Sequence, residues 1–399
     1  MSIPKKILFG FVTLTLLAGA LEGAARVLRY AREGRRTARV QNARPTMRDD
    51  LLHHAWKPSH KSLDSARETP FRLVTNRQSW LEEYDVAMAK PPNTYRIFYV
   101  GDSNTASVVD PEYKMVEIVE RQLNAAVRRG GADHLRFEVI NAGTSSYSFL
   151  LYYLQIKDRI LPYSPDLVVL NIDMTDVVND YVYRKTVLRS ANGEIQAVLP
   201  SSFIDTARYR MTPQGLVELS SVAPVSHWLI NHSAFCYYLD RTMAHFKGGT
   251  RADTKVSGLL DDRANWLAHE WSAQTTASVN ESMDVLRRTL RLLKSHGVKV
   301  MVTGVPHGPQ YTGEWSAKPH DILAQTVAEE QVPYLNSYTA IQQTVADDVE
   351  ISELYWPSDP THFNIIGNEV WARVQFEFLA HAGNQLLPRR KRASMELAR

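Results

Sequence analysis

Residues 96–105 read RIFYVGDSNT, a short apolar run that passes into a polar turn. The run combines apolar and β-favouring side chains, which predicts a strand that ends at Gly101. Residues 115–127 follow, with apolar side chains at helical spacing: Val116, Ile118, Val119, Leu123 and Val127. The stretch therefore predicts a strand, a turn and a helix in succession.

This alternation continues towards the end of the chain. Further strands are predicted at residues 137–141, 167–170, 298–302 and 332–335, and further helices at 149–161, 279–296, 322–330 and 364–380. Gly297 is the residue type that commonly ends a helix in a left-handed conformation. Because the strands are continuously apolar and separated by helices, we expect an α/β fold with a parallel sheet covered on both faces. Ligands of such sheets bind at the carboxyl ends of the strands.

The alternation breaks down between about residues 181 and 274. Asn192-Gly193 lies between two apolar runs and predicts a hairpin, and residues 227–246 predict an aromatic-rich helix. We interpret this stretch as an inserted cap region over one edge of the sheet. Its aromatic side chains could stack on sugar rings or form the insertion's own core: Tyr181, Tyr183, Trp228, Trp266 and Trp271.

Residues 1–25 are predicted to be a membrane anchor or a signal segment. Lys5 and Lys6 precede a 15-residue apolar run from Ile7 to Leu21, whereas a full membrane span needs about 20 residues. We expect a membrane-anchored protein of the cell envelope, on the periplasmic or extracellular face. The arginines that follow would favour the opposite orientation, or they could bind anionic headgroups.

The other boundaries follow from composition. Residues 26–90 are expected to form a basic juxtamembrane segment and an amino-terminal arm. Pro91-Pro92 marks the entry into a main domain at 91–383. Residues 384–399 are expected to form a solvated basic tail.

The composition excludes several classes of protein. Hydrophobic residues make up 44% and charged residues 22%, the balance of a globular chain. The net charge of +3 gives no reason to expect nucleic acid as a partner. Cys236 is the single cysteine, so an internal disulfide framework and a multi-cysteine zinc site are both excluded.

Three polar motifs follow predicted strands. Ser103 lies on the turn after the first strand, where its hydroxyl can face a crevice and nearby backbone N–H groups can bind an oxyanion. Gly143, after the second strand, lets the backbone approach a reacting carbonyl and offers a second N–H. His362 precedes the last helix and can act as a base, with Asp359 close enough in sequence to orient it.

Together these motifs closely resemble the SGNH/GDSL hydrolase family, over roughly residues 94–380. The resemblance is carried by Gly101-Asp102-Ser103-Asn104-Thr105, by Gly143 and by Asp359-Pro360-Thr361-His362. It implies a three-layer α/β/α sandwich with a flavodoxin-like parallel sheet. It also implies a serine–histidine–aspartate triad of Ser103, His362 and Asp359 that works without a metal or another cofactor.

One motif departs from the family pattern. The family's third block reads Gly-x-Asn-Asp, and its asparagine donates to the oxyanion. In this chain Asp173 stands at the glycine and Thr175 at the asparagine. The expected oxyanion donors are therefore Ser103, Gly143 and Thr175. Further candidates to line the pocket are Asp102, Asn104, Asn171 and His307.

Three functions remain open at this point. The first is a serine esterase or deacetylase that acts on an O-acyl ester, with an envelope carbohydrate as the expected substrate. The second is an O-acyltransferase that passes the acyl group to a polysaccharide hydroxyl. The third is a membrane-tethered binding or scaffold protein with weak catalysis, which the threonine at position 175 favours.

Overall fold

The structure is a computed structural model, and it describes residues 12–13, 15–28, 45–64, 69–130, 135–204, 209–218, 233, 235, 264–345 and 349–388. Of the predicted helix at 227–246 only residues 233 and 235 are described, and residues 1–11 and 14 of the predicted anchor and the basic tail beyond residue 388 lie outside these ranges. Residues 15–28 are helical. Within the described residues, no helix combines the length and the apolar character needed to cross a membrane. The envelope location stays a prediction.

A five-stranded parallel sheet forms the centre of the main domain. Its strands are β5 (Thr94–Val100), β6 (Arg136–Asn141), β7 (Leu167–Asp173), β12 (Lys299–Val305) and β13 (Tyr334–Asn336). They lie in the order β6-β5-β7-β12-β13, and every neighbouring pair is parallel. Numbered along the chain this order is 2-1-3-4-5, the flavodoxin-like arrangement. The predicted parallel sheet is confirmed.

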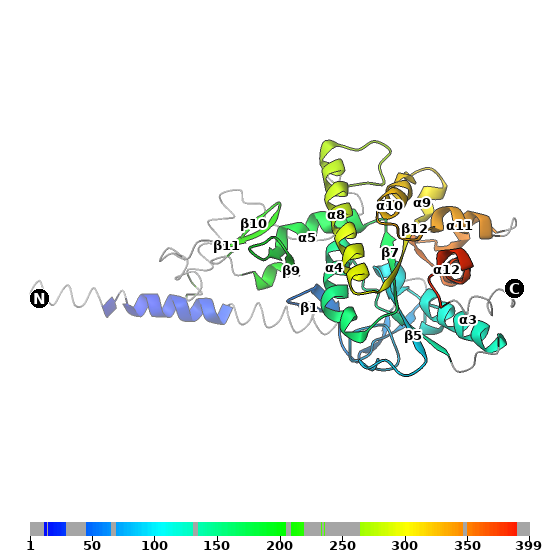
Figure 1. Cartoon of the computed structure of the whole chain (residues 1–399). Coiled ribbons are helices and arrows are strands. Elements are labelled where there is room, and N and C mark those ends of the chain that lie inside the picture. The colour runs from blue at the N-terminus through cyan, green and yellow to red at the C-terminus, as the bar shows by residue number, and fades with distance from the viewer. Residues whose placement is uncertain are drawn as a thin grey trace, which may run out of the picture.

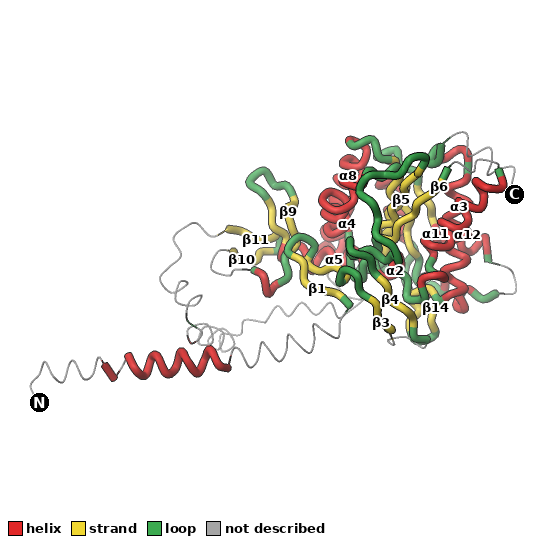
Figure 2. The backbone as a smooth tube through the Cα atoms, turned by 90° about the horizontal axis from the view of Figure 1, so that it is seen from below, coloured by secondary structure: helices red, strands yellow, loops and turns green. Residues whose placement is uncertain are grey.

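Helices cover both faces of this sheet, as Figures 1 and 2 show. One face packs against α4 (Phe149–Gln155), α5 (Asp176–Tyr183), α8 (Ala273–Ser295) and α10 (Lys318–Glu329). The other packs against α3 (Met115–Arg129), α11 (Ser337–Thr344) and α12 (Ile365–Ala380). Each face has its own buried apolar core. The α/β/α sandwich implied by the family resemblance is therefore confirmed.

Two element boundaries differ from the predicted ones for identifiable reasons. α8 begins six residues earlier than expected, because the Ser272 side chain caps it by accepting from the Thr275 backbone N–H. It ends as predicted at Gly297, which has a φ of 69°. The helix predicted at 149–161 is α4 followed by a π-helical turn, η2 (Ile156–Ile160).

The inserted region contains two short hairpins among its described residues. β8 (Val187–Arg189) pairs with β9 (Ile195–Val198) across the Asn192-Gly193 turn, as predicted. β10 (Tyr209–Thr212) pairs with β11 (Gly215–Glu218). Trp266 and Tyr183 are buried in the core beside the sheet, and Tyr181 and Trp271 pack against it. These four aromatic residues therefore pack in or against the core of the main domain, whereas the prediction had them stacking on sugar rings or forming the insertion's own core.

The amino-terminal arm is folded onto the main domain. It contains two hairpins, β1 (Thr46–Asp49) with β2 (His53–Trp56), and β3 (Lys61–Asp64) with β4 (Phe71–Val74). The Leu81 backbone N–H donates to the Asn141 carbonyl at the end of β6 (3.0 Å), and the Glu82 carboxylate accepts from the Asn141 backbone N–H (2.7 Å). The arm is thus part of the structure around the sheet's carboxyl edge.

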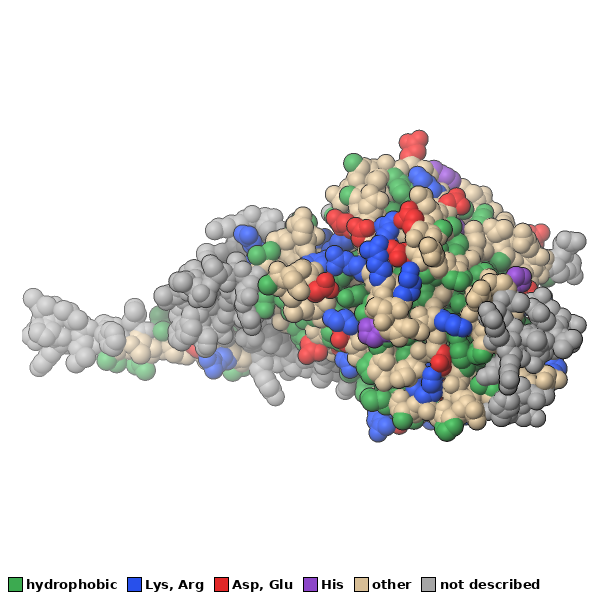
Figure 3. Space-filling view, in the orientation of Figure 1, with side chains coloured by type: hydrophobic (Ala, Val, Ile, Leu, Met, Phe, Trp, Pro, Cys, Tyr) green, Lys and Arg blue, Asp and Glu red, His purple; other side chains and the backbone are tan. Residues whose placement is uncertain are grey.

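Basic and acidic side chains lie interspersed on the face of the molecule seen in Figure 3. Among the described residues, the end of α10 carries Glu329 and Glu330, which pair with Arg287 and Arg291 of α8 at 2.8 Å and 2.6 Å. The Arg287–Glu329 pair is partly exposed, and such pairs contribute little to stability individually. They show opposite charges paired between neighbouring helices on the surface.

A buried histidine makes the fold sensitive to acid. Burial, with a smaller effect from His307, lowers the pKa of His320 from 6.5 to about 3. Its proton is therefore taken up mainly by the unfolded chain, so stability is present above pH 6.5 and is lost as the pH falls towards 3. We expect His320 to contribute about 2 kcal/mol of destabilisation between pH 7 and pH 5.

The His320→Phe variant tests this expectation, because its ring can keep the stacking on Tyr338. Urea unfolding at pH 7 and pH 5 should show a smaller loss of stability in the variant than in the wild type. The His296→Phe variant at an exposed position should match the wild type. An equal pH dependence in the His320 variant and the wild type would contradict the expectation.

Candidate active site

The three predicted triad residues come from two loops at the carboxyl edge of the sheet. Ser103 begins α2 (Ser103–Ala106), the short turn that follows β5, and the Asp102 side chain caps this turn by accepting from the Asn104 backbone N–H. Asp359 and His362 lie on β15 (Asp359–Phe363), which pairs with β14 (Tyr355–Trp356) ahead of α12. The short strand β15 was not predicted from the sequence.

The structure brings these three side chains into one hydrogen-bonded line. Nε2 of His362 lies 2.8 Å from Oγ of Ser103, and Nδ1 of His362 lies 2.8 Å from Oδ2 of Asp359. Both distances are within the reach that a nucleophile, base and orienting acid need. The Asp359 and His362 side chains are each 16% exposed, so solvent reaches the histidine.

Two neighbours hold this line in place. The Thr361 hydroxyl donates to Oδ1 of Asp359 at 2.6 Å, which leaves Oδ2 for the histidine. Asn104 joins the two loops, because its Nδ2 donates both to the Thr361 carbonyl (2.9 Å) and to Oδ2 of Asp173 (2.8 Å). The predicted pocket residue Asn104 is therefore buried and ties the serine turn to the histidine strand.

Gly143 lies directly against the serine turn. A Cβ atom at this position would come within 2.4 Å of the Ala106 backbone nitrogen, so only glycine fits without a shift of the turn. Its own N–H donates to Oδ1 of Asn141 at 3.0 Å. To bind an oxyanion, this N–H would have to leave Oδ1 of Asn141.

Thr175 also has a partner within its own turn. Its backbone N–H and its hydroxyl both donate to Oδ1 of Asp173 at 2.8 Å. The single hydroxyl proton that was expected to face an oxyanion is therefore directed at Asp173. The two departures from the family pattern, at positions 173 and 175, form one hydrogen-bonded unit.

The remaining candidates lie beneath the surface. Asn171 is fully buried and donates from Nδ2 to the Thr105 hydroxyl at 3.0 Å, so it braces the serine turn from inside the sheet. His307 is also buried, and its Nε2 lies 3.0 Å from Oδ2 of Asp173. Both contact residues of the site from below, whereas the prediction had them lining the pocket.

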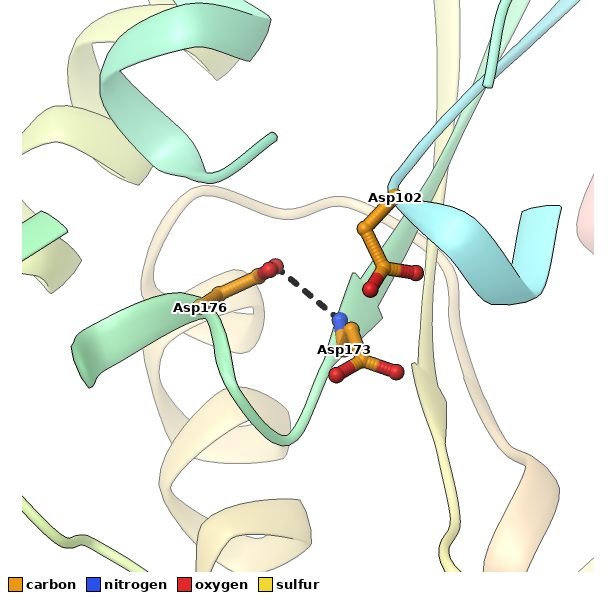
Figure 4. A group of neighbouring side chains, drawn as sticks. All are labelled: Asp102, Asp173 and Asp176. Atoms are coloured by element: carbon orange, nitrogen blue, oxygen red, sulfur yellow. Dashed lines mark hydrogen bonds between the residues drawn. The ribbon is translucent and has the colours of Figure 1, made fainter. Parts of the chain in front are cut away.

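Asp102, Asp173 and Asp176 form a buried carboxyl cluster beside the serine turn (Figure 4), and one oxygen of each lies within 4.8 Å of the others. Protein groups already donate to these carboxyls. Oδ2 of Asp176 accepts from the Asp173 backbone N–H, and its Oδ1 accepts from the Tyr152 hydroxyl. We therefore interpret the cluster as a hydrogen-bonded network and assign no metal to it.

The pKa values of the three carboxyls are shifted in different directions. Burial favours the neutral form of Asp173, but His307 and the two Thr175 donors outweigh it and hold its pKa at about 2. Burial and the neighbouring Asp173 charge raise the pKa of Asp102 well above its usual range. Burial and the charges of Asp102 and Asp173 do the same for the pKa of Asp176.

The raised pKa of Asp102 affects how the proton of the Ser103 hydroxyl is shared. Oγ of Ser103 lies 3.0 Å from Oδ2 of Asp102 as well as 2.8 Å from Nε2 of His362. An ionised Asp102 would compete with His362 for the single hydroxyl proton. The raised pKa of Asp102 favours its neutral form, which competes less strongly for the serine proton.

Sequence reasoning missed one part of this site. Trp56 in β2 donates from its indole N–H to the Gly143 carbonyl at 2.8 Å, and Nε2 of His54 lies 2.8 Å from the Ser145 carbonyl oxygen. The amino-terminal arm therefore fixes the loop that follows β6. No local pattern links residues 90 positions apart, so only long-range packing shows this contact.

Comparisons with known proteins give remote structural likenesses. An acetylxylan esterase from Geobacillus stearothermophilus, Axe2, covers 74% of this chain and 96% of its own at 12% identity, with a TM-score of 0.40. TesA covers 73% of this chain and 99% of its own at 11% identity, with a TM-score of 0.38. A putative GDSL-like lipase from Parabacteroides merdae covers 73% of this chain and 96% of its own at 13% identity, with a TM-score of 0.39. No family model and no curated protein matches the sequence.

These values are too low to carry a function from the solved structures to this chain. The fold stands on the chain's own strand order, 2-1-3-4-5, which is the order that the resemblance to SGNH/GDSL hydrolases implies. The functional conclusion has to stand on the geometry around Ser103.

Proposed function

We propose that this chain is a serine esterase of the SGNH/GDSL type, which hydrolyses O-acyl esters with Ser103 as nucleophile. One observation carries the proposal: the continuous line from Oγ of Ser103 through His362 to Oδ2 of Asp359, with 2.8 Å at each contact. A scaffold protein has no use for this arrangement. A serine hydroxyl needs just such a base to become an effective nucleophile.

The reaction follows from these contacts. Oγ of Ser103 attacks the ester carbonyl while Nε2 of His362 takes the hydroxyl proton, and Asp359 orients the ring and stabilises its positive charge. The imidazolium then gives this proton to the departing alkoxide, which leaves the acyl group on Oγ. Water repeats the sequence with His362 as its base, which releases the acid and restores Ser103.

The oxyanion is assigned to backbone donors. The Ser103 N–H lies on the attacking turn, and the Gly143 N–H becomes the second donor when it leaves Oδ1 of Asn141, to which it donates at 3.0 Å. The Thr175 hydroxyl is bonded to Asp173, so this assignment does not depend on it. Each oxyanion donor is typically worth a hundred- to thousandfold in rate.

The exposure of the site favours water as the acceptor. The His362 side chain is 16% exposed, so a water molecule can approach the base without a conformational change. This favours hydrolysis over acyl transfer to an alcohol. An acylated carbohydrate remains the predicted natural substrate.

The test is the hydrolysis of p-nitrophenyl acetate and of an acetylated oligosaccharide by the full chain. The wild type should release p-nitrophenol and acetate, and the Ser103→Ala variant should not. A Ser295→Ala variant on the exposed end of α8 serves as the matched control. If a folded wild type hydrolyses neither ester, the esterase proposal is wrong. A product that appears only with an added sugar hydroxyl would instead establish acyl transfer.

A further inference from the structure

A pocket of about 130 Å³ adjoins Ser103, and the amino-terminal arm forms one of its walls. The apolar part of the lining comes from Trp56, Phe71 and Leu73 on the arm, and from Ala106 and Val108 on the serine turn and after it. The polar part consists of Asp64, Ser103, Ser107 and Ser145. The nucleophile therefore lines a pocket of mixed character whose apolar side chains come mainly from the arm.

The wall that the arm supplies is fixed in position. Trp56, Phe71 and Leu73 are buried and form one apolar cluster with Ala106 of the serine turn. Hydrogen bonds hold this cluster to both sides of the site: Trp56 donates to the Gly143 carbonyl at 2.8 Å, and the Arg72 backbone N–H donates to Oδ1 of Asp110 at 2.6 Å. This wall of the pocket is thus preformed, so substrate binding does not have to order it.

The size and the lining limit what the pocket can hold. A dry cavity of about 150 Å³ lined by aliphatic and aromatic side chains holds a molecule the size of benzene. A pocket of about 130 Å³ beside Ser103 therefore accommodates roughly four or five carbon atoms next to the reacting carbonyl. A sugar ring with its hydroxyls would leave several polar groups without partners against Trp56, Phe71 and Leu73.

We propose that this pocket, with the arm as its wall, binds the acyl group of the ester and restricts it to short chains. The inference rests on the proposed function and specifies its substrate. Ser103 attacks at the mouth of the pocket, the acyl chain points towards Leu73, and the alcohol departs towards solvent at His362. The arm is then part of the substrate site and sets the acyl specificity.

The experiment compares p-nitrophenyl acetate, butyrate and octanoate as substrates of the full chain. Because each buried methylene contributes about 0.8 kcal/mol, kcat/KM should rise about fourfold for each methylene that fits the pocket. Butyrate carries two more methylenes than acetate, so its kcat/KM should be about fifteenfold higher, and that of octanoate should fall well below that of butyrate.

Two variants should shift this profile in opposite directions. Leu73→Ala enlarges the pocket and should raise kcat/KM for octanoate relative to kcat/KM for butyrate. Val108→Phe, at a half-buried position, fills the pocket and should remove the advantage of butyrate over acetate. Leu63→Ala, an exposed leucine of the same arm, should keep the wild-type profile. Because Val108 is only half-buried, its variant decides the question even if Leu73→Ala fails to fold.

The outcomes separate this inference from the proposed function. If the wild type hydrolyses none of the three esters, the proposed function fails, and the inference fails with it. If all three are hydrolysed but Val108→Phe retains the wild-type butyrate-to-acetate ratio, the pocket does not bind the acyl group while the esterase stands.

Discussion

The His362→Ala variant is expected to lower kcat for ester hydrolysis by about 10⁶-fold, the size of effect seen when the base of a serine triad is removed. Without the ring, no group within 2.8 Å of Oγ of Ser103 can take its proton on the solvent side. The loss should appear in kcat rather than in KM, because His362 is assigned to proton transfer and not to substrate binding.

The Asp359→Asn variant should lose less, about 10⁴-fold, because the ring remains but is held in the wrong tautomer. The double variant should be no worse than His362→Ala alone, since the two residues act as one unit. Initial rates with p-nitrophenyl acetate give all three values, with His296→Ala as a control at an exposed histidine. A His362→Ala variant within tenfold of the wild type would refute the assigned base.

The second large effect is expected for Asp173→Asn. Four donors converge on this buried carboxylate: the Thr175 N–H and hydroxyl on Oδ1, and Asn104 Nδ2 and His307 Nε2 on Oδ2. An amide must present its NH₂ group to one of these pairs, so donors would face donors. Removing one partner of a buried charged pair typically costs about 3 to 5 kcal/mol.

Urea unfolding measures this loss directly. Asp284→Asn, at an exposed helix position paired with Arg287, should change stability by less than about 0.5 kcal/mol. We also expect Asp173→Asn to reduce activity, because Asn104 joins Asp173 to the loop that carries His362. An Asp173→Asn variant as stable as the Asp284→Asn control would show that Asp173 does not hold the site together.

Much of the fold could be predicted from the sequence because local patterns determine it. The apolar strands and the amphipathic helices produce a periodicity that a single segment reveals. β7 was predicted to end at Leu170, three residues too early, because Asn171 and Asp173 break the apolar run. Both are buried all the same: Nδ2 of Asn171 donates to Thr105, and the Asp173 carboxylate accepts from Thr175 and is bonded to His307.

The site was predictable only in part. Ser103, Asp359 and His362 could be named because each lies in a short motif of suitable residue types. The roles of the arm and of Asp173 could not be, because they depend on contacts between segments far apart in the sequence. Trp56 contacts the loop at Gly143, and His307 contacts Asp173 across 134 positions. No local pattern carries this information.

The central claim is that Ser103 is an activated nucleophile, and the most direct test is labelling by a fluorophosphonate probe. The full-length wild type, Ser103→Ala and His362→Ala would be treated in parallel, and the modified residue would be located by mass spectrometry. The account predicts a single adduct on Ser103 in the wild type and none in either variant. A folded wild type that takes up no probe, or one that is labelled equally well without Ser103, would contradict it.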